Sequence, residues 1–238
     1  MFEFLKNIMN KKDQTNEINL VHRILKTDFK KDPNPQEDEI IFGCGCFWGA
    51  EKCFWKLPGV VTTSVGYAGG DKINPTYYEV CAGLTGHAEV VRVIWNKSKI
   101  DISDLLKMFW ECHDPTQKNR QGNDIGTQYR SAIYYKNDNI KEIIFASKTQ
   151  YQKELNKKNF GLIVTEIKKI ETYFFAEQYH QQYLASAGSR QYCSASPTNV
   201  KLGDFTGSNY KLKNHVWENF NWEVDKCVLR SDNNPIKN

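Results

Sequence analysis

Seven cysteines are the residues of this 238-residue sequence whose chemistry is most informative. An odd number cannot all be paired within one chain, so at least one thiol is unpaired or acts with a partner. No two of them form a Cys-x-x-Cys pair, so the thioredoxin-type motif and the usual zinc half-site are absent. Most are expected to be small buried hydrophobic residues. They stand at Cys44, Cys46, Cys53, Cys81, Cys112, Cys193 and Cys227.

Cys46 differs from the others by its position. It follows Gly43 and Gly45, where a predicted strand turns into a predicted helix that begins near Phe47. Glycines allow an unusual backbone and a close approach by a substrate. A helix N-terminus offers unpaired N–H groups and the positive end of the dipole, so we expect the thiol pKa to fall by about one unit or more. This position suits a nucleophile, but the strand–turn–helix pattern alone does not favour that role over simple packing beside the strand.

The elements that must position Cys46 follow from the spacing of apolar residues. Because strands and helices are mixed without a strict parallel alternation, the sequence favours an α+β domain. Strands are predicted over residues 39–43, 60–67, 87–95, 128–135 and 162–167. Helices are predicted over 47–57, 102–109, 139–157 and 174–184, with a short one at 19–25.

One compact region lies between two polar ends. Residues 1–38 are polar, finish in a proline-containing stretch, and are predicted to be an extension and linker. Residues 39–193 form the compact part, and 194–238 form a C-terminal extension. We expect the aromatic residues of that extension to pack back onto the domain. They are Trp217, Phe220 and Trp222.

Composition and charge exclude several classes of protein. With 40% hydrophobic residues the chain can bury a core, which excludes a disordered or coiled-coil protein. Lys and Arg number 32 against 28 Asp and Glu, and the sequence has no block of basic residues of the kind that binds nucleic acid or an anionic membrane. No apolar run reaches the ~18 residues of a membrane span, and no export signal opens the chain. We therefore expect a cytoplasmic monomer whose cysteines stay reduced.

Several motifs in order carry a family resemblance. Gly45-Cys46-Phe47-Trp48-Gly49 resembles the signature pentapeptide of A-type peptide methionine sulfoxide reductases. The resemblance covers roughly residues 39–193, and so many ordered matches make chance agreement very unlikely. The further matching segments are Gly66–Gly70, Asn74–Tyr77, Gly86–Glu89, Phe109–Pro115, Arg120–Ser131 and His180–Leu184.

This resemblance implies a nucleophile and a proton donor. Cys46 would attack the sulfur of methionine sulfoxide, an oxidation product that can be reduced back to methionine. Glu89 would supply a proton to the departing oxygen, because a carboxyl held partly dry stays protonated near neutral pH. Glu89 shares a strand face with Val91 and Val93, which favours a shielded position over a solvated one.

The resemblance also implies the walls of the site. Tyr77 and Tyr129 would donate hydrogen bonds to the sulfoxide oxygen as charge develops there. Asp124 would help to orient the site, through water or a substrate backbone group. Phe47 and Trp48 would clasp the methyl group on the sulfoxide sulfur. From spacing alone, packing in the core explains these aromatic residues at least as well.

A second thiol would condense with the sulfenic acid left on Cys46. By resemblance this resolving thiol is Cys193 in a flexible tail, and an external dithiol such as thioredoxin reduces the disulfide. Many relatives carry a glycine-rich tail with another cysteine close behind, which this chain lacks, so Cys227 is a candidate second recycling thiol. Cys44 could trap Cys46 instead. The remaining cysteines are expected to be packing residues: Cys53, Cys81 and Cys112.

The family fold implied is a ferredoxin-like plait, with helices packed on a small mixed β-sheet and irregular terminal extensions. The enzyme implied is a peptide-methionine (S)-S-oxide reductase that repairs free and protein-bound methionine sulfoxide, without a metal or other cofactor. Three alternatives stay open. They are a hydrolase in which His87 or His180 is the base for Cys46, a module that binds oxidised methionine without reducing it, and a structural zinc protein.

Overall fold

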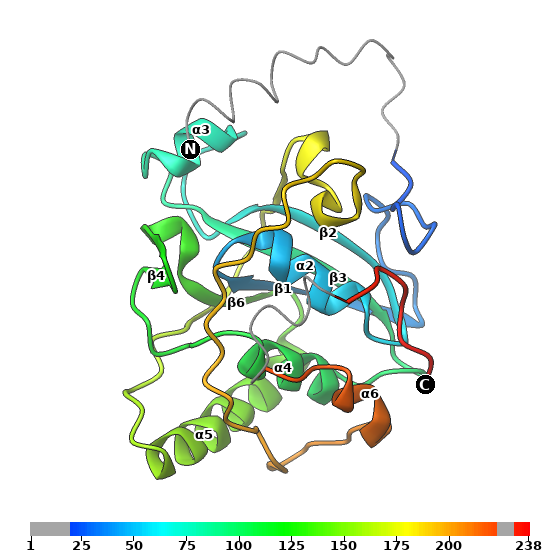
Figure 1. The fold of residues 1–238 in the computed structure, drawn as a ribbon, viewed down its shortest axis with the longest axis vertical. Coiled ribbons are helices and arrows are strands. Elements are labelled where there is room, and N and C mark those ends of the chain that lie inside the picture. The colour runs from blue at the N-terminus through cyan, green and yellow to red at the C-terminus, as the bar shows by residue number, and fades with distance from the viewer. Residues whose placement is uncertain (1–19, 223–230) are drawn as a thin grey trace.

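A six-stranded mixed sheet forms the centre of the computed structural model, which describes residues 20–222 and 231–238 (Figure 1). Its order is β7-β6-β1-β3-β2-β8; β6 and β7 pair in parallel, and the other neighbours pair antiparallel. This arrangement, with its helices, confirms the α+β class. The strands of this sheet are β1 (Glu37–Cys44), β2 (Val60–Ala68), β3 (Ala88–Asn96), β6 (Ser131–Tyr135), β7 (Glu166–Lys169) and β8 (Phe174–Phe175).

The other elements connect or flank these strands. A separate two-stranded ladder is made by β4 (Arg120–Gln121) and β5 (Asp124–Ile125). The described α-helices are α2 (Phe47–Trp55), α3 (Tyr77–Cys81), α4 (Ile102–Glu111), α5 (Lys141–Lys157) and α6 (Asn214–Glu218). The described 3-10 helices are η1 (Thr127–Tyr129), η2 (Asp138–Ile140), η3 (Gln178–His180) and η4 (Tyr183–Ala185).

The order of the elements explains how distant residues meet. The series β1, α2, β2, β3, α4, β6 follows the β-α-β-β-α-β pattern, with β1 and β3 as adjacent inner strands. Phe42 pairs with Val91 in the antiparallel β1–β3 ladder. The end of β1, which leads into Cys46, therefore lies beside the start of β3, which carries Glu89.

The main core lies between one face of the sheet and the helices. Phe42 of β1 is fully buried and stacks on Phe54 of α2, with ring centroids 4.8 Å apart, and on Phe109 of α4 at 5.1 Å. Offset stacking of this kind adds to the stabilisation from apolar burial. Both helices are thereby fixed on the inner strands that hold the site.

The short helix predicted at 19–25 is wrong for the residues that the structure describes there. Val21 forms an isolated bridge with Asp28, and the chain turns between them. The Nδ1 atom of His22 accepts the backbone N–H groups of Ile24 and Leu25, at 3.1 and 3.0 Å. These local bonds take donors that a helix would have used, so a turn forms instead.

The helix predicted at 174–184 is also wrong, because this segment divides into β8, η3 and η4. The side chain of Gln181 bonds to both the N–H and the C=O of Val65 in β2, at 3.0 and 2.9 Å. Gln182 has a left-handed backbone with φ of 47°. Tertiary hydrogen bonds to β2 thus override the helical spacing.

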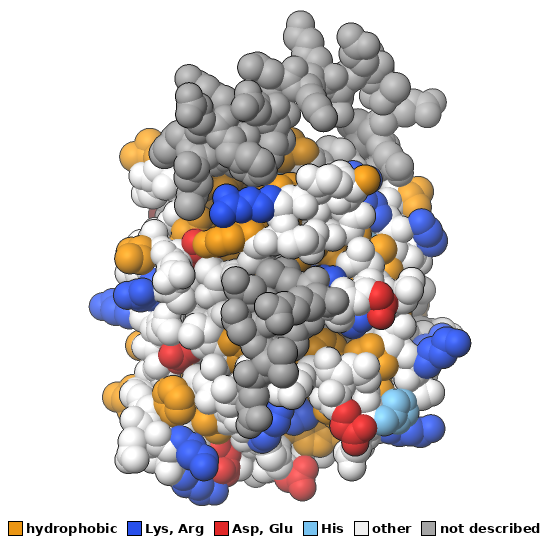
Figure 2. Space-filling view, in the orientation of Figure 1, with side chains coloured by type: hydrophobic (Ala, Val, Ile, Leu, Met, Phe, Trp, Pro, Cys, Tyr) orange, Lys and Arg blue, Asp and Glu red, His pale blue; other side chains and the backbone are white. Residues whose placement is uncertain are grey.

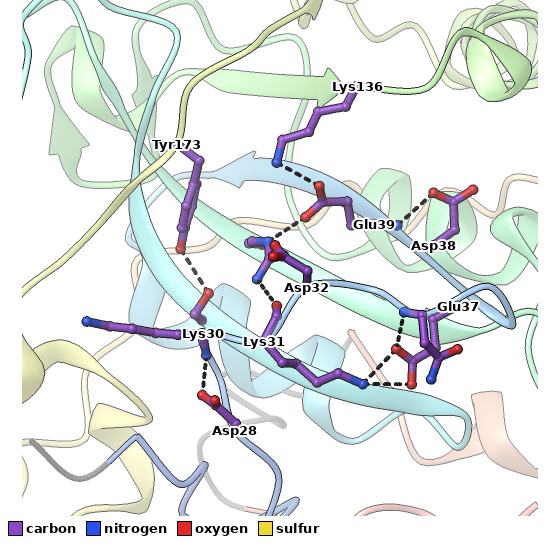
Figure 3. A network of polar contacts seen from close by, with 12 residues as sticks. Asp28, Lys30, Lys31, Asp32, Glu37, Asp38, Glu39, Lys136 and Tyr173 are labelled. Atoms are coloured by element: carbon purple, nitrogen blue, oxygen red, sulfur yellow. Dashed lines mark hydrogen bonds and ion pairs between the residues drawn. The ribbon is translucent and has the colours of Figure 1, made fainter.

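Residues just before β1 are tied to the sheet by ion pairs (Figure 3). Lys31 pairs with Glu37 at 2.7 Å, and the buried Arg92 of β3 pairs with Asp32 at 3.8 Å and donates to the carbonyl of Lys31 at 3.0 Å. Glu39 of β1 pairs in turn with Arg92 at 2.5 Å and with Lys136 at 2.7 Å. The described part of the predicted linker therefore packs on the domain, and β1 begins at Glu37 rather than at residue 39. The division at residue 38 stays a prediction.

The chain beyond η4 runs past α2 toward α5 and α6 (Figure 1). Buried carboxylates of α4 bind its backbone: Asp104 accepts the N–H of Lys211 at 2.9 Å, and Glu111 accepts the N–H of Leu202 at 2.9 Å. The expected packing of the aromatic residues is confirmed, since Phe220 is buried and Trp217 and Trp222 pack against the same core.

The surface shows mixed charge. On the face drawn in Figure 2, Lys and Arg side chains are scattered among acidic and uncharged ones rather than gathered in one block. Within the described ranges 20–222 and 231–238, no helix is both long and apolar enough to cross a membrane.

Candidate active site

Cys46 is the N-cap residue of α2, two positions after the end of β1. Gly45 before it has φ of 88°, and a Cβ on this glycine would lie only 2.6 Å from the Cβ of Gln121. Only glycine accommodates both the left-handed backbone and the close approach of β4. The predicted strand–turn–helix around the cysteine is confirmed.

The prediction that the helix N-terminus lowers the pKa of the Cys46 thiol is wrong. Burial and the nearby carboxylate of Glu89 raise this pKa well above its ordinary value. The backbone N–H of Trp48 bonds to the thiol and acts in the opposite direction, but it is outweighed. The resting sulfur is therefore a thiol, which must lose its proton during the reaction.

Glu89 reaches the start of α2 from β3. Its Oε2 accepts the backbone N–H of Phe47 at 3.1 Å, and its side chain is 1% exposed, so the predicted shielding is confirmed. Burial raises the pKa of Glu89 to about 8 and outweighs the effect of the Phe47 hydrogen bond. At neutral pH a protonated carboxyl is thus hydrogen-bonded to the backbone of Phe47, the residue that directly follows the Cys46 thiol.

The two predicted tyrosines face the same acid. The phenol of Tyr77 is buried, and its pKa is raised by burial and by the charge of Glu89. The pKa of Tyr129 is raised by burial and then by Glu89 and Cys46. Both phenols are therefore neutral O–H donors within electrostatic range of Glu89.

Phe47 and Trp48 are buried and form a wall with residues of the 180–184 motif. The indole N–H of Trp48 donates to Nδ1 of His180 at 3.0 Å, and Tyr183 stacks on the indole at a centroid distance of 3.9 Å. The His180 ring also packs on Phe47 at 5.1 Å and on Tyr77 at 4.4 Å. This histidine fixes the aromatic pair, a role that sequence reasoning missed.

A second buried carboxyl was also missed. Glu51 of α2 is fully buried and accepts hydrogen bonds from Thr63 Oγ1 at 2.9 Å and from the N–H and side chain of Gln182 at 2.9 and 2.8 Å. Burial raises the pKa of Glu51 to about 7. A glutamate at a core position of an apolar helix is the signal that could have found this anchor between α2 and the 180–184 motif.

Asp124 is buried and holds the tail. One of its oxygens accepts the hydroxyl of Tyr192 at 2.6 Å, and the other accepts the hydroxyl of Ser194. The tail continues along the same hairpin, where the N–H of Ser196 bonds to Gln121 Oε1 at 3.1 Å. The residues on both sides of Cys193 are thus clamped, whereas the sequence favoured a flexible tail.

Cys193 lies against the first turn of α2. A Cβ on Gly49 would lie 2.5 Å from the Sγ of Cys193 and 3.2 Å from its Cβ. The absence of a side chain at Gly49 therefore makes the space that the second sulfur occupies. A charge on Cys193 also contributes to the raised pKa of Cys46, so the two thiols lie within electrostatic range of each other.

Cys44 is directed elsewhere. It is buried in the main core, and its sulfur lies within 4.8 Å of the ligand atoms of Cys112 and His113. The structure groups Cys44 with these core residues rather than with Cys46. Cys227, the candidate second recycling thiol, lies outside the described residues.

The histidines give little support to a Cys–His hydrolase. His87 Nδ1 accepts the N–H of Gly70 at 3.1 Å, and its other nitrogen lies 2.8 Å from the carbonyl of Lys72. His180 is engaged with Trp48, and burial lowers its pKa to about 3. Neither imidazole is a base poised for Cys46.

The fold and this site define a thiol-dependent oxidoreductase, in which a buried acid adjoins one cysteine and a clamped tail presents another. The family model for peptide methionine sulfoxide reductase matches residues 38–212. A peptide methionine sulfoxide reductase MsrA of Vibrio vulnificus is 52% identical over 180 residues, covering 76% of this chain and 86% of its own. The MsrA of Pseudomonas putida strain W619 is 57% identical over 165 residues, covering 69% and 74%.

Solved structures agree. Methionine sulfoxide reductase A of Corynebacterium diphtheriae has a TM-score of 0.62 and 39% identity, and the likeness covers 74% of this chain and 89% of that one. Mxr1 of Saccharomyces cerevisiae in its reduced form has a TM-score of 0.60 and 35% identity, covering 68% and 92%. The chain belongs to the peptide methionine sulfoxide reductase family, in its A type, and is a peptide-methionine (S)-S-oxide reductase.

Proposed function

We propose that Cys46 and Glu89 carry out the reduction as a nucleophile and acid pair. The observation that carries this assignment is the contact of Glu89 with the Phe47 N–H, which places a buried carboxyl with a pKa of about 8 beside the thiol. Glu89 protonates the sulfoxide oxygen while the sulfur of Cys46 attacks the substrate sulfur. The thiol proton passes to the Glu89 carboxylate and restores its acid form, the protonated oxygen passes to Cys46 as sulfenic acid, and methionine leaves.

The roles that we propose for the walls of the site follow the family resemblance and are supported by the burial of these residues. The neutral phenols of Tyr77 and Tyr129 donate hydrogen bonds to the sulfoxide oxygen as negative charge gathers there. Phe47 and Trp48, fixed by His180, form the apolar wall for the substrate methyl group. Asp124 helps to orient the site in two ways. It binds the tail that carries Cys193, and it binds water or a backbone group of the substrate.

Cys193 then attacks the sulfenic sulfur, and water leaves as the disulfide forms. Its place over Gly49 and its partial exposure suit both attack on Cys46 and access by an external dithiol. Thioredoxin fits as that reductant, because two thiol–disulfide exchanges restore both cysteines without any other cofactor. We propose the cytoplasm as the compartment, since the cycle needs a reducing environment, and a monomer as the working unit.

Replacing Cys193 with serine tests the resolving role. We expect the variant to form one equivalent of methionine without reductant and to retain a sulfenic acid on Cys46 that dimedone labels. Thioredoxin-supported turnover should fall by at least about tenfold, because a hydroxyl cannot form the disulfide that thioredoxin attacks. Unchanged thioredoxin-supported turnover would show that another thiol resolves Cys46.

Replacing Gly49 with alanine tests the position of the second sulfur. The added methyl would lie 2.5 Å from the sulfur of Cys193 and must displace it. We expect disulfide formation, followed by stopped-flow fluorescence, to slow by about 10- to 100-fold, while the first equivalent of methionine forms at its normal rate. Gly161→Ala is the matched control, because a Cβ there meets its nearest atom at an ordinary 3.8 Å. Equal rates in both variants would contradict this geometry.

A further inference from the structure

Three cysteines that the proposed cycle does not use meet in the core beneath α2. Cys44, Cys53 and Cys112 are each at most 5% exposed. Cys112 is the centre of the group: its sulfur lies within 4.8 Å of that of Cys44, and its side chain also raises the pKa of Cys53. The sequence suggested separate packing residues at 53 and 112, but the fold gathers them into one buried thiol cluster, here called the inner thiols.

The inner thiols adjoin the catalytic pair through Cys193. Cys46, Gly49 and Cys53 follow one another at helical spacing along one face of α2. The sulfur of Cys193 covers Gly49, between the two ends of this row. The charge of Cys193 raises the pKa of both Cys46 and Cys112, so Cys193 lies within electrostatic range of the thiols on either side.

We propose that Cys112, with Cys44 beside it, is an internal acceptor for the disulfide formed between Cys46 and Cys193. This inference rests on the proposed function, which supplies that disulfide. The sulfur of Cys112 attacks Cys193, and Cys46 leaves as a thiolate that takes up the proton of Cys112. Cys44 then attacks Cys112, forms the Cys44–Cys112 disulfide and returns Cys193 to its thiol form. Each exchange conserves one disulfide and two hydrogens.

Thiol exchange accounts for this cluster better than a metal does. Cys44, Cys112 and His113 place their ligand atoms within 4.8 Å of one another, which would suit a thiophilic ion. However, His113 already engages the Phe109 carbonyl and the Ser131 hydroxyl, each at 2.7 Å. The two sulfurs close to each other are then the reactive part of the group.

The burial of Cys112 determines how fast this exchange runs and therefore under which conditions it matters. The pKa of Cys112 is raised, chiefly by desolvation, so few thiolates are present and the inner exchange is slow. A fast external dithiol would therefore reduce the Cys46–Cys193 disulfide first. When reductant is scarce, the disulfide is transferred to Cys44 and Cys112. Cys46 and Cys193 are then thiols again, and Cys46 can reduce a second methionine sulfoxide.

The test counts methionine formed by the full-length reduced protein without any reductant. Cys227→Ser is used as the background, so that this thiol cannot contribute. With excess methionine sulfoxide we expect a fast first equivalent and a slower second one, two in all. Adding Cys112→Ser should leave only one. Adding Cys81→Ser instead, which also removes one thiol, should leave the count at two.

Mass spectrometry of the oxidised background protein gives a second readout with Cys112 intact. Two disulfides, Cys46–Cys193 and Cys44–Cys112, would support the proposal. One equivalent of methionine with Cys46–Cys193 alone would overturn it and leave the proposed function standing. No methionine at all would overturn both. A Cys53–Cys112 bond would overturn the assignment of Cys44.

Discussion

Cys46→Ser is expected to lower the rate of methionine formation by at least about 10³-fold. Reduction requires an atom that can accept the sulfoxide oxygen and later give it up as water. Sulfur does so as a sulfenic acid, whereas a serine oxygen would have to become a hydroperoxide. The hydroxyl is also a far weaker nucleophile than a thiolate. Chromatographic measurement of methionine with dithiothreitol as reductant gives the rate independently of Cys193.

The fold provides an internal control for this substitution. Cys46 is the N-cap of α2, and its thiol is a weaker partner for the Trp48 N–H than a hydroxyl would be, whereas serine is among the favoured N-cap residues. The variant should therefore melt at the same temperature as the parent chain or slightly higher. A variant that folds, binds methionine sulfoxide and does not reduce it assigns the loss to the sulfur. Retained reduction would require a different nucleophile.

The residues proposed for the site could be named from the sequence, but their surroundings could not. The strand–turn–helix predicted around Gly45 is confirmed, because only glycine permits that turn, and the family pentapeptide singled out Cys46 as the proposed nucleophile. The pKa of Cys46 was predicted in the wrong direction, since the helix N-terminus is visible in the sequence but the burial and the Glu89 carboxylate are tertiary. Local sequence patterns also do not reveal that Cys53 and Cys112, far apart in the chain, belong to one buried thiol cluster beneath α2.

The 174–184 segment shows a second limit. Its aromatic and Gln side chains have helical spacing, yet Gln181 bonds to β2 and Gln182 bonds to Glu51. These contacts satisfy buried groups that no local pattern reveals. The family resemblance marked this segment as important without giving a reason, and the structure supplies one: it fixes α2 and Trp48.

Glu89→Gln is expected to lower turnover by about 10²- to 10⁴-fold, the usual contribution of a general acid. Glutamine retains the size of the side chain and an oxygen for the Phe47 N–H, but it carries no acidic proton. In the parent enzyme, activity should fall as pH rises through about 8, where Glu89 loses its proton. The variant should show no such fall. Glu154→Gln in α5, where the glutamate pairs with Lys157, is the matched control with normal activity.

The Glu89→Gln substitution, which lowers activity, should raise stability relative to the parent chain as the pH rises. The pKa of Glu89 is about 8 in the folded protein against 4.5 ordinarily, so between these values the folded state holds a proton that the unfolded state has lost. The free energy of unfolding therefore falls as pH rises across this window. Glu89→Gln removes that contribution and should gain stability relative to the parent chain between pH 5 and pH 8. Glu51, with a pKa of about 7, adds the same trend to both proteins and cancels in the difference.

Alkylation of Cys46 separates proton donation from activation of the thiol. The Glu89 carboxylate raises the pKa of Cys46, so at pH 9 its removal should let iodoacetamide react faster in the Glu89→Gln variant than in the parent chain. An enzyme whose cysteine is more reactive but whose turnover is lower has lost an acid, because thiolate formation is no longer what limits it. If turnover and alkylation instead fell together, Glu89 would serve mainly to prepare the thiol, and the proton for the sulfoxide oxygen would have to come from Tyr77 or Tyr129.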